Sequence, residues 1–583
     1  MSDNDKTSDA NDHLRELARK FALKNAIDYG KAIEGRVISR ILFAIPSIKS
    51  NMKEVSSIAK EEVAKVNSLS KEELTAEYAK YASEFEEEEA KKAEKSSTHD
   101  YSIDGAEQGK FATRFPPEPG GYMHIGHTKP LFIEDLLREK YNGKFFLYFD
   151  DTNPDNEKQE YVDAFHDDLK WLGMKFDREY YASDHIPMLY EYAITAINAG
   201  KAYVCTCKKE EITEKRAAGN ACVHKGQSIG ENLEKWKMML NGEFPDGEAI
   251  LRLNSDMKSL NTTMRDPTLF RIKHKTHYRH GDEYFVWPTY DFCTPIVDSV
   301  EGVTDALRSK EYELRDELYY AVLDILKLRK PKITSFARFE ITNNMTSKRK
   351  VRALIQEKKI DGWDDPRLVT VRALRRRGIT VEALRNIALS FGLSKKESQI
   401  SMNVILDANR RIIDPKTKRL FAINDPIEVE VENIGENQSS ISIPLHPTEN
   451  LGSRSYDTTK GLLIKSENAA TIKSGDVLRL RRAFNIKISE ISPDKIIAEY
   501  AGNETNDKAK MTYWIPKEGM TKCELWDIGD LLINEEFNKN ALTKRSCYAE
   551  RYVNELNEGD VIQFEGQGMY KLDNKAEMRF ISV

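Results

Sequence analysis

The sequence is poor in cysteine and has no long apolar run. Its six cysteines in 583 residues are too few for a disulfide framework, so we expect a reducing, intracellular compartment. No apolar stretch approaches the roughly 20 residues that span a bilayer. The polar, acidic N-terminus does not resemble a signal peptide. These absences favour a cytoplasmic protein that does not insert into a membrane.

The remaining composition is that of a globular protein with several domains. Apolar residues make up 40% of the chain and charged residues 32%, and 583 residues are too many for one core. The net charge of −6 argues against a nucleic-acid partner, but the charge is uneven. Residues 345–378 hold eleven Lys/Arg and four acidic residues. This segment can face phosphates or form a solvated helical surface, and both interpretations stay open.

One stretch organises the rest of the chain. A strand over 110–115 and a helix over 129–141 are predicted on either side of a Pro/Gly-rich loop,. A helix start presents free N–H groups and the positive end of the helix dipole. Gly126 leaves the backbone open to a flat ligand, and His124 and His127 can donate hydrogen bonds without a permanent charge,. The pattern predicts a nucleoside triphosphate at this helix start.

The string from Arg114 to His127, R-F-P-P-E-P-G-G-Y-M-H-I-G-H, resembles the first signature of the class I aminoacyl-tRNA synthetases, in its glutamyl/glutaminyl version. The second signature of that class, usually K-M-S-K-S, has a divergent counterpart in Met345-Thr-Ser-Lys-Arg349. The resemblance covers about residues 105–583. It implies His124, His127 and Lys348 as catalytic residues that hold the phosphates. It also implies that ATP, with Mg²⁺, binds Glu118, Pro119, Gly120, His124, Gly126, His127, Ser309, Arg338, Phe339, Thr346, Ser347 and Lys348.

A substrate pocket is predicted beside the nucleotide. A buried strand over 145–149 ends at Asp150, where a carboxylate can hold an ammonium group or cap a turn. The resemblance places Tyr290 and Arg308 against the substrate side chain, and glutaminyl enzymes carry cysteine at the position of Arg308. A guanidinium binds a carboxylate through two hydrogen bonds and leaves an amide mismatched. We therefore expect glutamate to bind Arg114, Asp150, Tyr290 and Arg308.

Two further strands are expected around this pocket, over 284–292 and over 333–341. The first would enter the crevice at Tyr290, and the second would lead into the divergent second signature.

Four soft ligands occur in two close pairs, Cys205 with Cys207 and Cys222 with His224. This set fits a tetrahedral structural zinc site, in which the protein occupies every coordination position. The alternative is three free thiols and a surface histidine. The surrounding segment, 205–285, interrupts the alternation of strands and helices, and the resemblance implies that such an insertion contacts the acceptor end of tRNA.

In the C-terminal half of the sequence, predicted helices give way to short predicted strands. Helices are predicted over 381–391 and 394–407, and Arg375, Arg376 and Arg377 are candidates for contacts with tRNA phosphates. Beyond about residue 414, short strands separated by turns predict β-barrels, at 426–431, 440–443, 476–480, 495–500 and 560–564. The resemblance is to the barrels that read the anticodon in glutaminyl and archaeal-type glutamyl enzymes.

The first hundred residues read as helical and end in an acidic run at 84–89 followed by lysines, which is typical of a solvated helix or a tether. This extension is a candidate for docking another protein or for simple packing.

The sequence therefore predicts a multidomain α/β protein. Its predicted parts are an N-terminal helical extension (1–104), a Rossmann-type parallel-sheet catalytic domain in two halves (105–204 and 286–345), an inserted acceptor-end-binding domain (205–285), a helical stem-contact domain (346–414) and all-β barrels (415–583).

The activity that the resemblance implies is the ATP-dependent joining of L-glutamate to the 3′ end of tRNA(Glu) through a glutamyl-adenylate, by a monomer. A glutaminyl enzyme, or one that also charges tRNA(Gln) with glutamate, is the nearest alternative. A non-catalytic tRNA- or protein-binding relative and a general nucleotidyl transferase are more distant ones, and the latter leaves the barrels unexplained.

Overall fold

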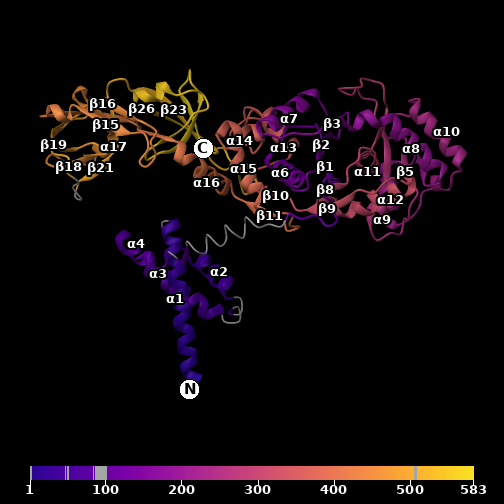
Figure 1. The fold of residues 1–583 in the computed structure, drawn as a ribbon, viewed down its shortest axis with the longest axis horizontal. Coiled ribbons are helices and arrows are strands. Elements are labelled where there is room, and N and C mark those ends of the chain that lie inside the picture. The colour runs from indigo at the N-terminus through magenta and orange to yellow at the C-terminus, as the bar shows by residue number, and fades with distance from the viewer. Residues whose placement is uncertain are drawn as a thin grey trace. The chain divides into compact units, whose positions relative to one another are not determined.

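The computed structural model describes residues 3–29, 31–45, 48, 52–82, 84–85, 101–469, 471–504 and 509–583. The chain divides into two compact units, residues 1–100 and 101–583 (Figure 1). Most of the predicted acidic run and the lysines after it lie outside the described residues. Within the described ranges no helix is both long enough and apolar enough to cross a bilayer.

The N-terminal unit is helical, as predicted. Its described helices are α1 (Asp3–Tyr29), α2 (Glu34–Ala44), α3 (Met52–Asn67) and α4 (Lys71–Ala79). Helix α3 buries Val55, Ala59, Val63 and Val66, which recur every three or four residues and form one face. This face packs with α1 and α2 around a core of its own.

The catalytic sheet is parallel, as the sequence predicts. Strands β1 (Ala112–Phe115), β2 (Lys144–Phe149) and β3 (Arg178–Tyr181) pair in that order, and β8 (Asp305–Ser309) pairs with β9 (Lys332–Phe336). The two pieces adjoin where the Thr304 N–H donates to the Ala112 carbonyl at 2.8 Å. Strand β2 is buried from Phe145 onward, as expected for a sheet covered on both faces. The associated helices are α6 (Ile125–Lys140), α7 (Gln159–Trp171), α11 (Tyr290–Val300) and α12 (Asp316–Leu326).

The predicted strand over 284–292 is wrong for most of its length. A three-residue strand, β7 (Val286–Pro288), joins the sheet of the inserted segment, and helix α11 begins at Tyr290. A short apolar run fits a strand or a helix equally well, and here the Cys293 N–H donates to the Thr289 carbonyl at 2.9 Å as in a helical turn. Tyr290 therefore reaches the pocket from a helix.

The inserted segment folds around an antiparallel sheet in the order β4 (Ala202–Cys205), β5 (Ile250–Leu253), β6 (Thr268–Ile272) and β7. Helices α9 (Lys209–Ala218) and α10 (Ile229–Leu240) belong to this segment, and α8 (Ile186–Asn198) precedes it in the chain and contacts α10 and β4.

Two other predicted elements are also divided in the structure. The strand expected over 333–341 is interrupted at Ala337 and Arg338, and its second part, β10 (Phe339–Ile341), pairs with β11 (Ser398–Ile400). The helix expected over 394–407 is wrong in its first half, because β11 precedes α16 (Met402–Ile413). In both cases a pairing between distant segments overrides the local apolar pattern. The other helices of this region are α13 (Lys348–Gln356), α14 (Val371–Arg377) and α15 (Val381–Leu389).

The C-terminal region is all-β and barrel-like, and the predicted short strands are confirmed as β14, β15, β18, β20 and β27. Two seven-stranded sheets lie among the described residues, in the orders β12-β27-β28-β29-β23-β26-β13 and β21-β18-β19-β20-β14-β17-β22 (orange to yellow in Figure 1). The strands are β12 (Lys418–Leu420), β13 (Ala422–Ile423), β14 (Pro426–Glu432), β17 (Leu462–Lys465), β18 (Val477–Leu480), β19 (Asn485–Ile491), β20 (Lys495–Tyr500), β21 (Lys510–Thr512), β22 (Trp514–Pro516), β23 (Thr521–Ile528), β26 (Leu542–Ala549), β27 (Val561–Phe564), β28 (Gly568–Asn574) and β29 (Arg579–Ser582). Separate hairpins are β15 (Ser440–Pro444) with β16 (Ser453–Asp457) and β24 (Leu532–Ile533) with β25 (Glu536–Phe537).

Candidate functional site

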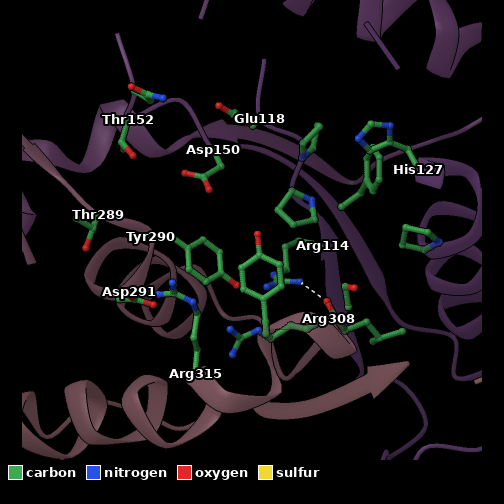
Figure 2. A pocket seen from close by; sticks show the side chains of 18 of the residues that line it. Arg114, Glu118, His127, Asp150, Thr152, Thr289, Tyr290, Asp291, Arg308 and Arg315 are labelled. Carbon is green, nitrogen blue, oxygen red and sulfur yellow. Dashed lines mark hydrogen bonds and ion pairs between the residues drawn. The ribbon is translucent and has the colours of Figure 1, made fainter. Parts of the chain in front are cut away.

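A cavity of about 790 Å³ opens where the parallel sheet, the start of α6, the start of α11 and the inserted segment meet (Figure 2). It collects predicted residues that are far apart in the sequence. Those that line it are Arg114, Glu118, His124, Gly126, His127, Asp150, Tyr290, Arg308, Ser309, Arg338 and Lys348. Parts of the chain from both sides of the insertion therefore converge on one pocket.

Five predicted ATP-binding residues do not line this cavity: Pro119, Gly120, Phe339, Thr346 and Ser347. Phe339 is 3% exposed and stacks on Phe391 in the core, with ring centroids 4.9 Å apart. Its side chain therefore does not face a nucleotide, and Phe336 lines the pocket wall instead. Thr346 and Ser347 lie at the surface, directly before Lys348.

The two signature histidines are held as neutral hydrogen-bond donors. The Gly126 N–H donates to His124 Nδ1 at 3.1 Å, and the His124 N–H donates to His127 Nδ1 at 3.1 Å. With both Nδ1 atoms accepting, each neutral ring carries its proton on Nε2. Burial, together with the charge of Lys348, lowers the pKa of His124 to about 3. Burial, together with His124 and Lys348, lowers the pKa of His127 well below its ordinary value. The pair can thus donate to phosphate oxygens without charge.

Lys348 comes close to the first signature. It is the first residue of α13, and its Nζ lies 3.3 Å from the Glu118 carbonyl oxygen and 3.4 Å from Glu118 Oε2. A Cβ placed on Gly121 would lie 2.8 Å from Lys348 Cδ, so glycine at that position leaves room for the lysine. The histidine pair and the lysine of the second signature therefore share one site.

Arg308 offers unused donors inside the pocket. Its guanidinium carbon lies 5.3–5.5 Å from the ring centroids of Tyr290, Tyr312 and Tyr319. Nη1 donates to Asp316 Oδ1 at 3.1 Å, but Nε and Nη2 are buried without a hydrogen-bond partner in the described part of the chain. Unsatisfied buried donors are costly. A ligand carboxylate would supply the acceptors that the protein does not provide.

Asp150 lies on another wall of the cavity (Figure 2). Burial, together with the negative charge of Glu118, raises its pKa to about 7. A substrate ammonium group would favour the charged form of this carboxyl.

Several lining residues are not predicted from the sequence. Arg271 comes from β6 of the insertion and donates to the Thr152 carbonyl at 3.2 Å, and Arg315 forms an ion pair with Asp291. Glu134 is buried with both carboxyl oxygens unpartnered among the described residues, and burial raises its pKa. Its position two helical turns after His127, on the same face of α6, is a sequence signal that could have identified it.

The predicted tRNA-contact arginines differ in their surroundings. Arg376 forms an ion pair with Asp573 at 2.8 Å, and Arg377 is 5% exposed and donates to the Ser582 carbonyl. Both tie α14 to the barrel strands. Arg375 is exposed and lies 3.3 Å from Asp167, so it alone of the three keeps a surface position.

The four predicted metal ligands come together. The ligand atoms of Cys205, Cys207, Cys222 and His224 all lie within 4.8 Å of one another. Cys207 Sγ is 3.4 Å from His224 Nδ1, and Cys205 Sγ is 3.7 Å from Cys222 Sγ. Three sulfurs and one imidazole nitrogen at this spacing suit a tetrahedral metal ion.

A parallel sheet with paired histidines at a helix start, a lysine from a later segment in the same pocket and C-terminal barrels is the architecture of a class I aminoacyl-tRNA synthetase. Residues 110–415 match the family "tRNA synthetases class I (E and Q), catalytic domain", and residues 417–503 match its "anti-codon binding domain". The chain belongs to the class I tRNA synthetases for glutamate and glutamine, so the predicted resemblance is confirmed.

Similar proteins extend over nearly the whole chain. A "Glutamate--tRNA ligase" of Nitrosopumilus maritimus is 38% identical over 98% of this chain and 99% of its own length. One of Pyrococcus furiosus is 35% identical over 98% and 99%. Among solved structures, a glutamate-tRNA synthetase from Elizabethkingia anophelis has a TM-score of 0.39 at 17% identity, over 53% of this chain and 72% of that one; a likeness of that size supports no further conclusion.

Proposed function

We propose that this chain joins L-glutamate to the 3′ end of tRNA(Glu). In the first step, an oxygen of the substrate α-carboxylate forms a bond to the α-phosphorus of ATP, and pyrophosphate leaves. In the second, a ribose hydroxyl of the terminal adenosine attacks the carbonyl carbon of the glutamyl-adenylate, and AMP leaves. No side chain of the enzyme forms a covalent bond to a substrate, so catalysis depends on positioning the substrates and on stabilising phosphoryl charge.

The observation that carries this proposal is that one cavity is lined by the residues proposed to bind the nucleotide and by those proposed to bind the amino acid. The neutral histidine pair and Lys348 lie at one part of the cavity wall, and Arg308 with its unpartnered Nε and Nη2 lies at another. His124 and His127 would donate to phosphate oxygens, and Lys348 would meet the charge that builds as pyrophosphate leaves. Mg²⁺, when bound with ATP, would neutralise part of the phosphate charge. Ser309 and Arg338, which also line the cavity, are the remaining proposed nucleotide contacts.

The amino acid would be held by ion pairs at its side-chain carboxylate and at its ammonium group. Arg308 and Arg114 are the proposed partners of its side-chain carboxylate, and the Tyr290 ring lies beside the Arg308 guanidinium. Asp150 is the proposed partner of its ammonium group. A glutamine amide at the same place would leave a guanidinium donor facing N–H groups, which costs on the order of 1–3 kcal/mol. This argues against the glutaminyl alternative.

The deciding experiment is aminoacylation of purified tRNA(Glu) and tRNA(Gln) with labelled glutamate and labelled glutamine. Glutamate on tRNA(Glu) alone is the expected result. Glutamate on both tRNAs would make the enzyme non-discriminating, and glutamine on tRNA(Gln) would overturn the proposed substrate. The non-catalytic alternative fails if ATP–pyrophosphate exchange appears in the presence of tRNA.

The Cys205, Cys207, Cys222 and His224 cluster is proposed to hold one structural Zn²⁺, since the protein supplies four ligands,. Arg375 and the barrels are proposed to contact tRNA phosphates and the anticodon, and the N-terminal unit is a proposed docking module. The protein is proposed to act as a monomer in the cytoplasm.

A further inference from the structure

A buried arginine contacts both the Cys/His cluster and Asp266, the residue that precedes Pro267 and Thr268 of the active-site wall. Arg252, on β5, is 1% exposed. Its Nη1 lies 3.9 Å from Cys205 Sγ and 3.8 Å from Cys222 Sγ, within the range of hydrogen bonds to sulfur. Its Nε donates to the Asp266 carbonyl oxygen at 2.9 Å. One guanidinium therefore contacts two of the four proposed metal ligands. It also contacts the backbone of Asp266, which lies in the connection between β5 and β6.

The charge of this guanidinium matches what the cluster lacks. Three thiolates and one neutral imidazole around a divalent ion carry a net charge of −1. A net charge is costly to bury unless an opposite charge accompanies it. Arg252 supplies +1 at contact distance, so the metal centre and the arginine together are neutral. Groups behind the direct ligands tune metal affinity in this way.

The other contact of Arg252 is with a strained residue. Asp266 has a φ of +42°, in a region that residues other than glycine rarely occupy. Its carboxylate accepts hydrogen bonds from the Tyr203 hydroxyl at 2.9 Å, the Ser255 N–H at 2.7 Å and Lys225 Nζ at 3.0 Å. The residues that follow it, Pro267 and Thr268, line the active-site cavity. The backbone conformation of Asp266 therefore determines the direction in which the chain enters the cavity wall at Pro267 and Thr268.

We propose that Arg252 couples the metal cluster to the active-site wall. At one end it neutralises the thiolates and so tightens metal binding. At the other end it holds the Asp266 backbone and so fixes the wall at 267–268. The inference rests on the proposed zinc site and names a positioning residue that does not itself touch the substrates.

The first test measures zinc affinity by competition with a chromophoric chelator. Arg252→Met keeps a buried side chain without charge and should raise the apparent Kd for zinc by about 10- to 100-fold. Arg252→Lys keeps the charge and should fall between Met and the wild type. Lys225→Met is the matched control, because the Lys225 side chain bonds the Asp266 carboxylate, whereas its contact with Cys222 is made by the backbone N–H, which the substitution keeps; it should stay within about twofold of the wild type. Circular dichroism checks that each variant is folded.

The second test uses only the wild-type protein and Arg252→Met. Amide hydrogen exchange over 263–268 should rise when zinc is removed from the wild type, whereas β2 should not change. In Arg252→Met the same segment should exchange at the higher rate with or without zinc.

The outcomes separate the two proposals. A wild type that neither carries nor takes up zinc overturns the zinc site and the coupling together. If the wild type binds zinc and Arg252→Met binds it equally well, the coupling alone is overturned. The coupling alone is also overturned if hydrogen exchange over 263–268 in the wild type is the same with and without zinc.

Discussion

Asp298 holds the guanidinium of Arg114 through two parallel contacts. Arg114 Nε lies 2.7 Å from Asp298 Oδ1, and Nη2 lies 3.0 Å from Oδ2. Both side chains are almost completely buried, and the third nitrogen donates to the Leu307 carbonyl at 3.0 Å. The signature arginine therefore has its direction fixed by α11 and β8 before any substrate arrives. This pair links the first signature of the chain to elements almost two hundred residues later.

Removal of Asp298 should destabilise the protein and disturb the pocket. Asp298→Ala leaves Arg114 charged and buried without its partner, which typically costs about 3–5 kcal/mol. Asp298→Asn retains one acceptor and should cost less. Thermal unfolding measures the first effect, and an increased KM for glutamate measures the second. Glu107→Ala, which breaks an exposed pair with Lys110, is the control and should change neither. An unchanged melting temperature in Asp298→Ala would contradict the structural role.

Arg308→Cys should weaken selection of glutamate over glutamine. The change removes the only buried guanidinium donors of the pocket that lack partners in the described residues. Selectivity, taken as the ratio of kcat/KM values, should fall by about 5- to 150-fold, as expected for about 1–3 kcal/mol of lost recognition. Arg308→Lys keeps the charge but not the two-point geometry and should lie between. Unchanged selectivity in a competition assay would show that Arg308 does not contact the side chain.

Lys348→Ala should lower kcat for aminoacylation by on the order of 100-fold, because the variant lacks the positive charge that meets the leaving phosphates. Lys350→Ala is the matched control. Lys350 lies on the same helix and is exposed, and it does not line the cavity. The control should keep a rate close to that of the wild type. A rate close to that of the wild type in Lys348→Ala would remove Lys348 from the mechanism.

Asp150 should make stability depend on pH. Its folded-state pKa of about 7 lies above the ordinary value of 3.8, so the folded chain binds this proton more tightly than the unfolded chain does. The cost of ionising Asp150 is therefore absent below about pH 4 and fully present above about pH 7. Asp150→Asn should raise the melting temperature more at pH 8 than at pH 5.5, while glutamate use is lost.

Asp155→Asn serves as the control for that prediction. Lys273 and Lys275 hold the pKa of Asp155 below its ordinary value, so removal of its charge should not raise the melting temperature at pH 8. A gain in both variants would point to a general effect of negative charge rather than to the burial of Asp150.

Metal analysis of the purified protein should find about one zinc per chain, from the four-ligand count. Cys207→Ser should lower the zinc content, because the variant loses one of the four clustered ligands. Cys523→Ser removes a buried thiol from a barrel strand and should leave the zinc content unchanged. Zinc loss in both variants, or in neither, would refute the assignment of the cluster.

Local sequence patterns predicted much of the fold for physical reasons. The helix after the Pro/Gly-rich loop was predictable because its apolar residues over 129–141 recur at helical spacing, although the helix begins earlier, at Ile125. Strand β2 was predictable because a continuous apolar run suits a strand covered on both faces. The barrel strands were predictable because short alternating segments separated by turns have few other solutions.

Errors arose where distant segments decide the structure. Strands β7 and β10 pair with partners that the local pattern does not reveal, and the side chain of Phe339 turned into the core although its neighbour Arg338 lines the pocket. Arg376 and Arg377 read as free cations in the sequence because their partners, Asp573 and Ser582, lie about two hundred residues away.

The sequence by itself determined the family, the two signatures, the cluster of soft ligands and the guanidinium expected to select an acid. These features are local, or consist of residue types whose chemistry does not depend on their neighbours. Only the tertiary structure decided that Asp298 orients Arg114, that Arg308 has two donors without a partner among the described residues, and that Arg252 contacts Cys205, Cys222 and the Asp266 backbone. Such contacts depend on burial and distance between segments, and the free energy of a charge in a protein is set by what surrounds it in space.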